Sequence, residues 1–109
     1  MADFTLRDLE KRVQERAKAG ADASYTRKLL DRGVSHCAKK LGEEATETVI
    51  AALGQDGRAL TREAADLLYH LLVLLESRNV PLGDVMAELE RRMGTSGLAE
   101  KGARGKPPQ

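Results

Sequence analysis

Four carboxylates stand at a regular spacing in the middle of this sequence. Glu44 and Glu47 are three residues apart, and so are Glu63 and Asp66. Side chains three apart on an α-helix share one face, so each pair presents two acids to the same neighbour. Asp66 lies within residues 64–75, which are otherwise almost wholly apolar. We therefore expect Asp66 in or near the core, where an acid needs a partner.

A divalent metal ion is the partner that these acids fit best. A carboxylate removed from water is costly unless it is paired or metal-bound. The connection from Gly54 to Leu60 is short, so we expect the two acid-bearing segments to be antiparallel neighbours with facing acids. Hard oxygen ligands suit Mg²⁺, or Mn²⁺ in its place, and such ions commonly bind through carboxylates and substrate phosphates. The predicted metal ligands are Glu44, Glu47, Glu63 and Asp66.

The alternative interpretation is a solvated acidic surface with ordinary ion pairs, such as Lys39 with Glu43 or Lys40 with Glu44. For Glu43 we favour this alternative, because Glu43 falls away from the shared face on a helical wheel. For the four acids together we favour the metal site, since a solvated face does not explain Asp66 in a Leu-rich helix.

Helical periodicity and capping signals predict five helices that position these acids, and the predicted fold class is all-α with a core like that of a four-helix bundle. The fourth helix is apolar around most of its circumference, so a chain this short needs a second copy to cover it. We therefore expect a homodimer. The predicted helices run from Thr5, with a capping box to Asp8, to Gly20; from Ser24 to Gly33; from Ser35 to Gly54; from near Thr61 to Arg78; and from Pro81 to Gly94.

Length and composition restrict the remaining possibilities. The 109 residues suffice for one domain, which we place at residues 1–96, followed by a flexible tail at 97–109 with little apolar content. The net charge of +1 is too small to favour nucleic acid or an anionic membrane as a partner. The longest apolar run, at 71–75, is far too short to span a bilayer. The single cysteine, Cys37, is interpreted as a small apolar residue in a cytoplasmic protein.

Three segments together resemble a known family. They are Ser24–Tyr25–Thr26, residues 39–47 with 50–52, and residues 63–70. The sequence is similar to the phosphoribosyl-ATP pyrophosphohydrolases, which belong to the all-α nucleoside triphosphate pyrophosphatases together with MazG-type enzymes and dimeric dUTPases. The resemblance covers roughly residues 4–98. It implies that Glu44, Glu47, Glu63 and Asp66 ligate Mg²⁺, and that the active unit is a homodimer of interlocked helices.

The resemblance also implies a reaction, the hydrolysis of phosphoribosyl-ATP to phosphoribosyl-AMP and pyrophosphate in the second step of histidine biosynthesis. Bound Mg²⁺ would neutralise the phosphate oxygens and lower the pKa of a coordinated water, and our choice for the residue that takes the proton is Glu44. Lys40 shares the face of Glu44 and is a candidate phosphate contact.

Other residues near the motif have two interpretations each. Tyr25 is either a packing residue or, with Thr26, part of a nucleotide pocket. His70 is either a hydrogen-bonded core histidine or a residue that orients the metal site. Lys28 and Arg27 are interpreted as solvated charges.

Three rival functions differ in what they require. A house-cleaning pyrophosphatase of the MazG or dimeric dUTPase type would have the same metal site and other nucleotides as substrates. A di-iron bundle would need Glu-x-x-His motifs, and His70 stands four residues after Asp66 instead of three. A non-enzymatic dimeric interaction module would need no metal and would tolerate neutral replacements of the acids.

Overall fold

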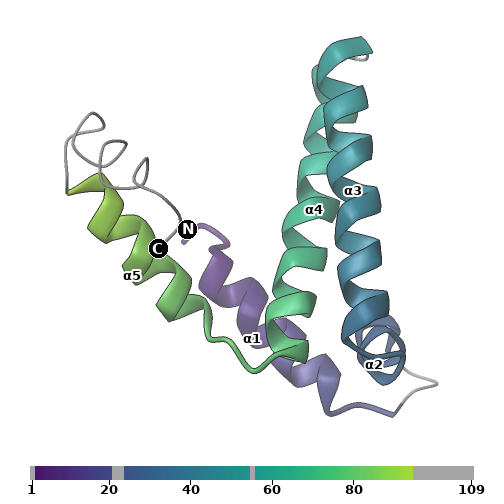
Figure 1. Cartoon of the computed structure of the whole chain (residues 1–109), viewed down its shortest axis with the longest axis vertical. Helices are drawn as coiled ribbons and strands as arrows, with labels where there is room; N and C mark the ends of the chain where they lie inside the picture. Colours follow the sequence, from purple (N-terminus) through teal and green to yellow (C-terminus); the bar gives the residue numbers. More distant parts are fainter. Residues whose placement is uncertain (1, 21–23, 55, 95–109) are drawn as a thin grey trace, which may run out of the picture.

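The computed structural model describes residues 2–20, 24–54 and 56–94. All regular structure in these ranges is helical, which confirms the all-α prediction. The predicted tail at 97–109 lies outside the described residues. The elements, shown in Figure 1, are α1 (Leu6–Ala17), α2 (Tyr25–Asp31), α3 (Val34–Gly54), α4 (Gly57–Ser77) and α5 (Leu82–Met93).

Side-chain caps explain where two of the helices begin. At α1 the predicted capping box is present: the Thr5 hydroxyl accepts a hydrogen bond from the Asp8 amide at 3.1 Å, and the Thr5 amide donates to the Asp8 carboxylate at 3.0 Å. At α2 the Ser24 hydroxyl accepts from the Arg27 amide at 3.1 Å. Both helices therefore start at a residue whose side chain satisfies an amide that the helix leaves free.

The predicted start of α4 near Thr61 is wrong by about one helical turn. Asp56 is the N-cap, and its carboxylate accepts a hydrogen bond from the Ala59 amide at 2.9 Å, so the helix begins at Gly57. The sequence does not distinguish this cap from a turn in the connection, because aspartate and glycine favour turns as well as caps. The connection between α3 and α4 is thus even shorter than predicted.

The shared core lies where all five helices meet. It consists of buried apolar side chains, at least one from each helix: Val13, Leu29, Cys37, Leu72, Val73 and Leu82. The assignment of Cys37 as a small core residue is confirmed, since it is buried in this cluster. Burial of such side chains is the main source of stability at this end of the molecule.

Above this core, α3 and α4 continue side by side as a long antiparallel pair, and α1 and α5 lean away from them in a second arm (Figure 1). The radius of gyration is 16.4 Å, whereas a compact domain of this length has about 13 Å. Among the described residues, the upper half of the α3–α4 pair is therefore not covered by a third helix.

The open shape corrects the prediction for α4. Leu72 and Val73 are buried as expected for a central helix, but Leu68 is 40% exposed and Asp66 is exposed as well. Asp66 is therefore not in the core of the single chain, because the half of α4 that bears it extends beyond the region where the helices meet. Among the described residues, none of the helices is long and apolar enough to cross a membrane.

Candidate metal and nucleotide site

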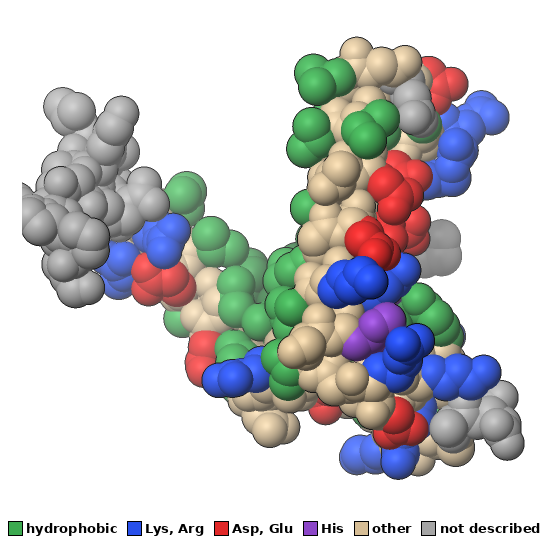
Figure 2. Space-filling model, turned by 45° about the vertical axis from the view of Figure 1, so that its right-hand side comes forward, with side chains coloured by type: hydrophobic (Ala, Val, Ile, Leu, Met, Phe, Trp, Pro, Cys, Tyr) green, Lys and Arg blue, Asp and Glu red, His purple; other side chains and the backbone are tan. Residues whose placement is uncertain are grey.

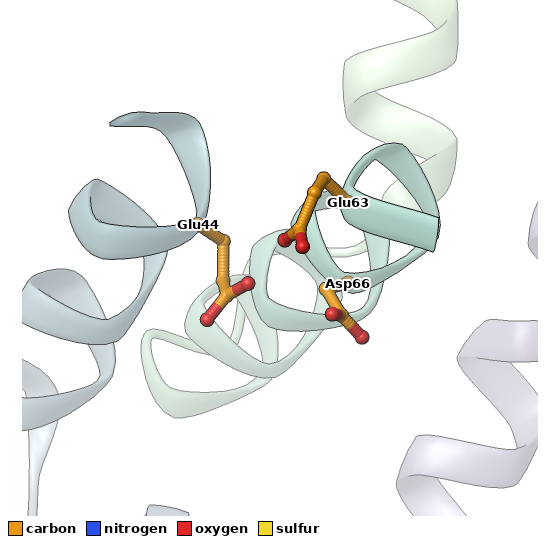
Figure 3. Close-up of side chains that lie close together, drawn as sticks. All are labelled: Glu44, Glu63 and Asp66. Atoms are coloured by element: carbon orange, nitrogen blue, oxygen red, sulfur yellow. The ribbon is translucent and has the colours of Figure 1, made fainter. Parts of the chain in front are cut away.

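Three of the four predicted acids converge between α3 and α4. Glu44 extends from α3, and Glu63 and Asp66 extend from α4, as Figure 3 shows. One carboxylate oxygen from each of the three residues lies within 4.8 Å of the other two. This spacing is compatible with a single cation held by all three acids. The i, i+3 spacing within α4 and the short connection to α3 account for the convergence.

Glu44 and Glu63 are the acids most withdrawn from water. The Glu44 side chain is only 8% exposed. Burial raises the pKa of Glu44 above its usual value, and the neighbouring charges of Glu47, Asp66 and Glu63 raise it further. One oxygen of Glu63, Oε1, is buried and has no hydrogen-bond partner among the described residues. A buried carboxylate oxygen without a partner is costly, and a divalent cation would satisfy it.

Glu47 and Glu43 differ from these three acids. Glu47 is exposed and does not belong to the group of three, although its charge reaches Glu44. Glu43 is exposed and forms an ion pair with Lys40 at 3.2 Å, which confirms its interpretation as a surface charge, although its partner is Lys40 and not Lys39. The hydrogen bond and the charge of Lys40 hold the pKa of Glu43 below its usual value.

A threonine fixes the two acid-bearing helices beside one another. The Thr48 hydroxyl lies 2.7 Å from the carbonyl oxygen of Glu44 on its own helix and 3.2 Å from that of Glu63 on α4. The second contact crosses between the helices at the level of the acids. Thr48 was not identified from the sequence, because a threonine inside a helix most often bonds only to its own preceding turn.

A polar aromatic cluster lies on the side of the acids nearer the core. Thr26, fully buried, shares a hydrogen bond of 2.6 Å with the Tyr69 hydroxyl, and either group can donate. His70 is also buried, and its ring meets Tyr69 edge to face, with centroids 5.0 Å apart. Tyr25 stacks on Tyr69 with centroids 6.4 Å apart and is itself exposed.

This cluster bears on three of the predicted site residues. Tyr25 has an exposed ring that a ligand can reach, whereas the Thr26 hydroxyl is engaged with Tyr69. Burial lowers the pKa of His70 below its usual value, and the positive charge of Lys40 lowers it further. Tyr69 was not predicted as a site residue, although its place beside His70 in a Leu-rich helix was a signal for it.

Lys40 lies between the acids and a cavity of about 530 Å³. It is one helical turn before Glu44 on α3, and it influences the pKa of Glu44. The cavity is also lined by Tyr25 and by three basic side chains, Lys28, Arg32 and His36. Acids and cations are thus arranged next to one another on one face, as the red and blue side chains in Figure 2 show.

This arrangement suits the chemistry of a phosphorylated nucleotide. Clustered carboxylates can bind a divalent cation that bridges to phosphate oxygens, and adjacent cations can compensate the remaining negative charge. An exposed tyrosine ring between them can contact a base or sugar.

Comparisons with known proteins agree with this reading. The family model of phosphoribosyl-ATP pyrophosphohydrolase matches residues 6–93. The phosphoribosyl-ATP pyrophosphatase of Agrobacterium fabrum is 59% identical over 107 residues, which cover 98% of this chain and 100% of that protein. The protein of the same name from Rhizobium meliloti is 58% identical, with the same coverage. That from Azorhizobium caulinodans is 59% identical over 100 residues and 92% of each chain.

Proposed function

The chain belongs to the phosphoribosyl-ATP pyrophosphohydrolase family, and we propose that it hydrolyses phosphoribosyl-ATP to phosphoribosyl-AMP and pyrophosphate. This reaction cleaves the α–β phosphoanhydride bond and is the second step of histidine biosynthesis. The observation that carries the proposal is the match of residues 6–93 to this family, combined with the convergence of Glu44, Glu63 and Asp66 at the matched segment.

The metal ligands in this proposal are Glu44, Glu47, Glu63 and Asp66, and the cation is Mg²⁺, with Mn²⁺ as a substitute. The unpartnered buried oxygen of Glu63 and the approach of Glu44 and Asp66 support three of these ligands. Glu47 is included because it lies one turn beyond Glu44 on α3 and its charge acts on Glu44. When bound, Mg²⁺ neutralises phosphate oxygens and makes water more acidic.

Glu44 is the proposed proton acceptor in the hydrolysis. It is the most buried acid of the site, and a carboxylate sheltered from water is a stronger base than an exposed one. Its place between Lys40 and the two acids of α4 puts it where phosphate groups and cation would meet. A general base must lie within hydrogen-bond reach of the water that it activates, and Glu44 is one of the three acids whose carboxylate oxygens lie within 4.8 Å of one another.

Four further residues are proposed to contact or position the substrate. Lys40 contacts a phosphate oxygen, and the exposed ring of Tyr25 contacts the nucleoside. Thr26 acts through its hydrogen bond to Tyr69, which holds the aromatic cluster in place. His70 contacts Tyr25 edge to face at 6.3 Å between centroids and so fixes the ring that faces the ligand.

We propose that the active unit is a homodimer. The upper half of the α3–α4 pair bears large apolar side chains that are exposed in the single chain: Val49, Ile50 and Leu53. A second copy packed on this half would also cover Asp66, which explains an acid in a Leu-rich helix.

A substrate comparison tests the proposed reaction against its nearest rival. Pyrophosphate release is measured from phosphoribosyl-ATP and from the common nucleoside triphosphates, each with and without Mg²⁺. We expect Mg²⁺-dependent release with a strong preference for phosphoribosyl-ATP. Equal or faster release from ordinary nucleoside triphosphates would assign the chain to the house-cleaning group, and no release from any of them would favour a non-enzymatic interaction module.

A further inference from the structure

The basic cavity beside the acids has a feature that the cleavage of a triphosphate does not require. Lys28, Arg32, His36 and Lys40 all line it, and they come from α2, from the connection after it and from α3. The acids lie at one end of this surface and the cations extend away from them. The cavity of about 530 Å³ therefore adds room for a further part of a ligand beside the acids.

The charges of Lys28 and Arg32 are available to a ligand, whereas Lys40 is paired with Glu43 at 3.2 Å. Lys28 and Arg32 form no ion pair with any described residue. Asp31, which also lines the cavity, is held by Arg27 at 2.9 Å. Burial lowers the pKa of His36, and the positive charges of Arg32 and Lys40 lower it further, as expected where cations gather.

The N-terminal end of α3, which lies at the cavity, also favours an anionic ligand. His36 lies in the first turn of α3, a helix of 21 residues, and that turn contains no acidic residue. The first amides of a helix and its dipole favour negative charge at this end. The basic side chains of the cavity and the N-terminal end of α3 therefore both favour an anionic ligand.

The spacing along α3 gives the distance between the two ends of the site. His36, Lys40 and Glu44 follow one another at intervals of four residues and so share one face. Eight residues of α-helix correspond to about 12 Å. A nucleoside can bridge such a distance between a phosphate at the acids and a second anionic group in the part of the cavity near His36, which Arg32 and Lys28 also line.

We propose that this cavity binds the monophosphate of the phosphoribosyl group, with Arg32 and Lys28 as its principal contacts. The inference rests on the proposed function, because phosphoribosyl-ATP bears this second phosphate in addition to its triphosphate. Ordinary nucleoside triphosphates lack it. Arg32 and Lys28 thus select the substrate, whereas the acids perform the cleavage.

Two substrates and two variants test this assignment. The substrates are phosphoribosyl-ATP and ribosyl-ATP, which is the same molecule without the monophosphate. The variants are Arg32→Gln and Lys28→Gln, and the matched control is Lys39→Gln, which removes the same charge from an exposed residue outside the cavity lining. Melting temperatures of all three confirm folding before the kinetics are compared.

With phosphoribosyl-ATP we expect Arg32→Gln to lower kcat/KM at least about tenfold, mainly through KM, since a charge-assisted hydrogen bond to phosphate is lost. Lys28→Gln should have a smaller effect of the same kind, and Lys39→Gln almost none. With ribosyl-ATP the kcat/KM of the wild-type protein should be as low as that of Arg32→Gln with phosphoribosyl-ATP. The Arg32→Gln substitution should not lower the kcat/KM for ribosyl-ATP further.

The outcomes separate the inference from the proposed function. If the wild-type protein releases no pyrophosphate from phosphoribosyl-ATP, the proposed function fails and the inference fails with it. If the wild-type protein is active and Arg32→Gln and Lys28→Gln match it, the function stands and the cavity assignment is overturned. Equal losses by the two variants on both substrates would also overturn it, because their effect would then not depend on the monophosphate.

Discussion

Glu43 and Glu44 are neighbours in the sequence with opposite environments. Glu44 is buried among acids, whereas Glu43 is exposed and paired with Lys40. Replacing either glutamate by glutamine removes one negative charge and almost no volume. The pair therefore allows the effect of charge at the metal site to be separated from the effect of charge on the same helix in general.

For the acids of the site we predict that Mg²⁺ reverses the order of the melting temperatures of the wild-type protein and its variants. Glu47→Gln and Asp66→Asn relieve repulsion among the acids, so without metal each variant should melt at the wild-type temperature or above it. Millimolar Mg²⁺ should raise the wild-type melting temperature more than that of either variant, because it binds the folded state. Both variants should lose about a hundredfold or more of turnover.

Thermal melts with and without Mg²⁺, together with pyrophosphate release, check this prediction. The control Glu43→Gln should keep both its metal response and its turnover, since an exposed ion pair contributes at most about 1 kcal/mol. Near-wild-type turnover of Glu47→Gln at saturating Mg²⁺ would remove Glu47 from the ligand set. The same result for Asp66→Asn would contradict the metal site itself.

The convergence of three of the acids was easier to predict than their environments. The i, i+3 spacing predicted that Glu63 and Asp66 share a face of α4, and the short connection predicted that Glu44 of α3 meets them. The same spacing predicted that Glu47 joins Glu44, but Glu47 lies outside the group. Burial of Asp66 was predicted wrongly, since apolar neighbours in sequence do not tell which of them another helix covers. Arg32 and His36 were not identified from the sequence as lining this cavity, because the cavity joins two elements and no single helical period links its lining.

At the scale of elements, the hydrogen bond between Thr26 and Tyr69 ties α2 to α4. Tyr69→Phe leaves the fully buried Thr26 hydroxyl without this partner, so we expect a loss of about 1–3 kcal/mol in the free energy of unfolding. Adding Thr26→Val removes the unpaired group, so the double variant should be more stable than Tyr69→Phe alone.

Urea denaturation at one fixed protein concentration measures both effects. The cycle of two single variants and the double variant isolates the coupling between the two hydroxyls. Strict additivity of the two substitutions would show that the hydroxyls do not depend on each other, against the 2.6 Å contact.

The N-terminus of α5 depends on a residue distant in sequence. Pro81, the N-cap, offers no side-chain hydrogen bond, and the Leu82 amide donates instead to the Glu10 carboxylate of α1 at 2.8 Å. We expect Glu10→Ala to increase amide hydrogen exchange throughout α5 while leaving α3 and α4 protected. The cost in stability should be about 1 kcal/mol, as for the loss of an N-cap.

Hydrogen exchange followed by mass spectrometry of peptides from α3, α4 and α5 distinguishes local from global effects. Glu15→Ala is the matched control, because Glu15 lies on the same helix and its side chain makes no hydrogen bond or ion pair among the described residues. If α5 exchanges equally in Glu10→Ala and in the control, the contact does not hold the helix.

Helix number and most helix ends were predictable because the capping box at Thr5, Gly33 and Pro81 are local signals. The start of α4 was not, since Asp56 has the same preference for a turn as for a cap. The separation of α1 and α5 from the α3–α4 pair was not predictable either. It depends on the few contacts between distant helices, and periodicity within each helix contains no information about them.

The shape of the whole molecule leaves hydrophobic side chains exposed at one end. The core occupies only the end where the five helices meet, and the hydrophobic side chains at the far end of α3 and α4 face solvent, as the green side chains at the top of Figure 2 show. Leu53 there is 83% exposed. A chain of 109 residues builds a small core, and a second copy would enlarge it.

We therefore predict that the protein is a homodimer at micromolar concentration, with a mass of twice 11.9 kDa in light scattering. Its melting temperature should rise with protein concentration, because association stabilises the folded chain by mass action. Leu53→Glu places a charge on the exposed apolar surface and should give a monomer whose melting temperature is lower and independent of concentration. The control Ala52→Glu adds the same charge to an exposed neighbour on a different side of α3 and should remain dimeric. A wild-type monomer at micromolar concentration would contradict the dimer, and a dimeric Leu53→Glu variant would move the interface to another surface.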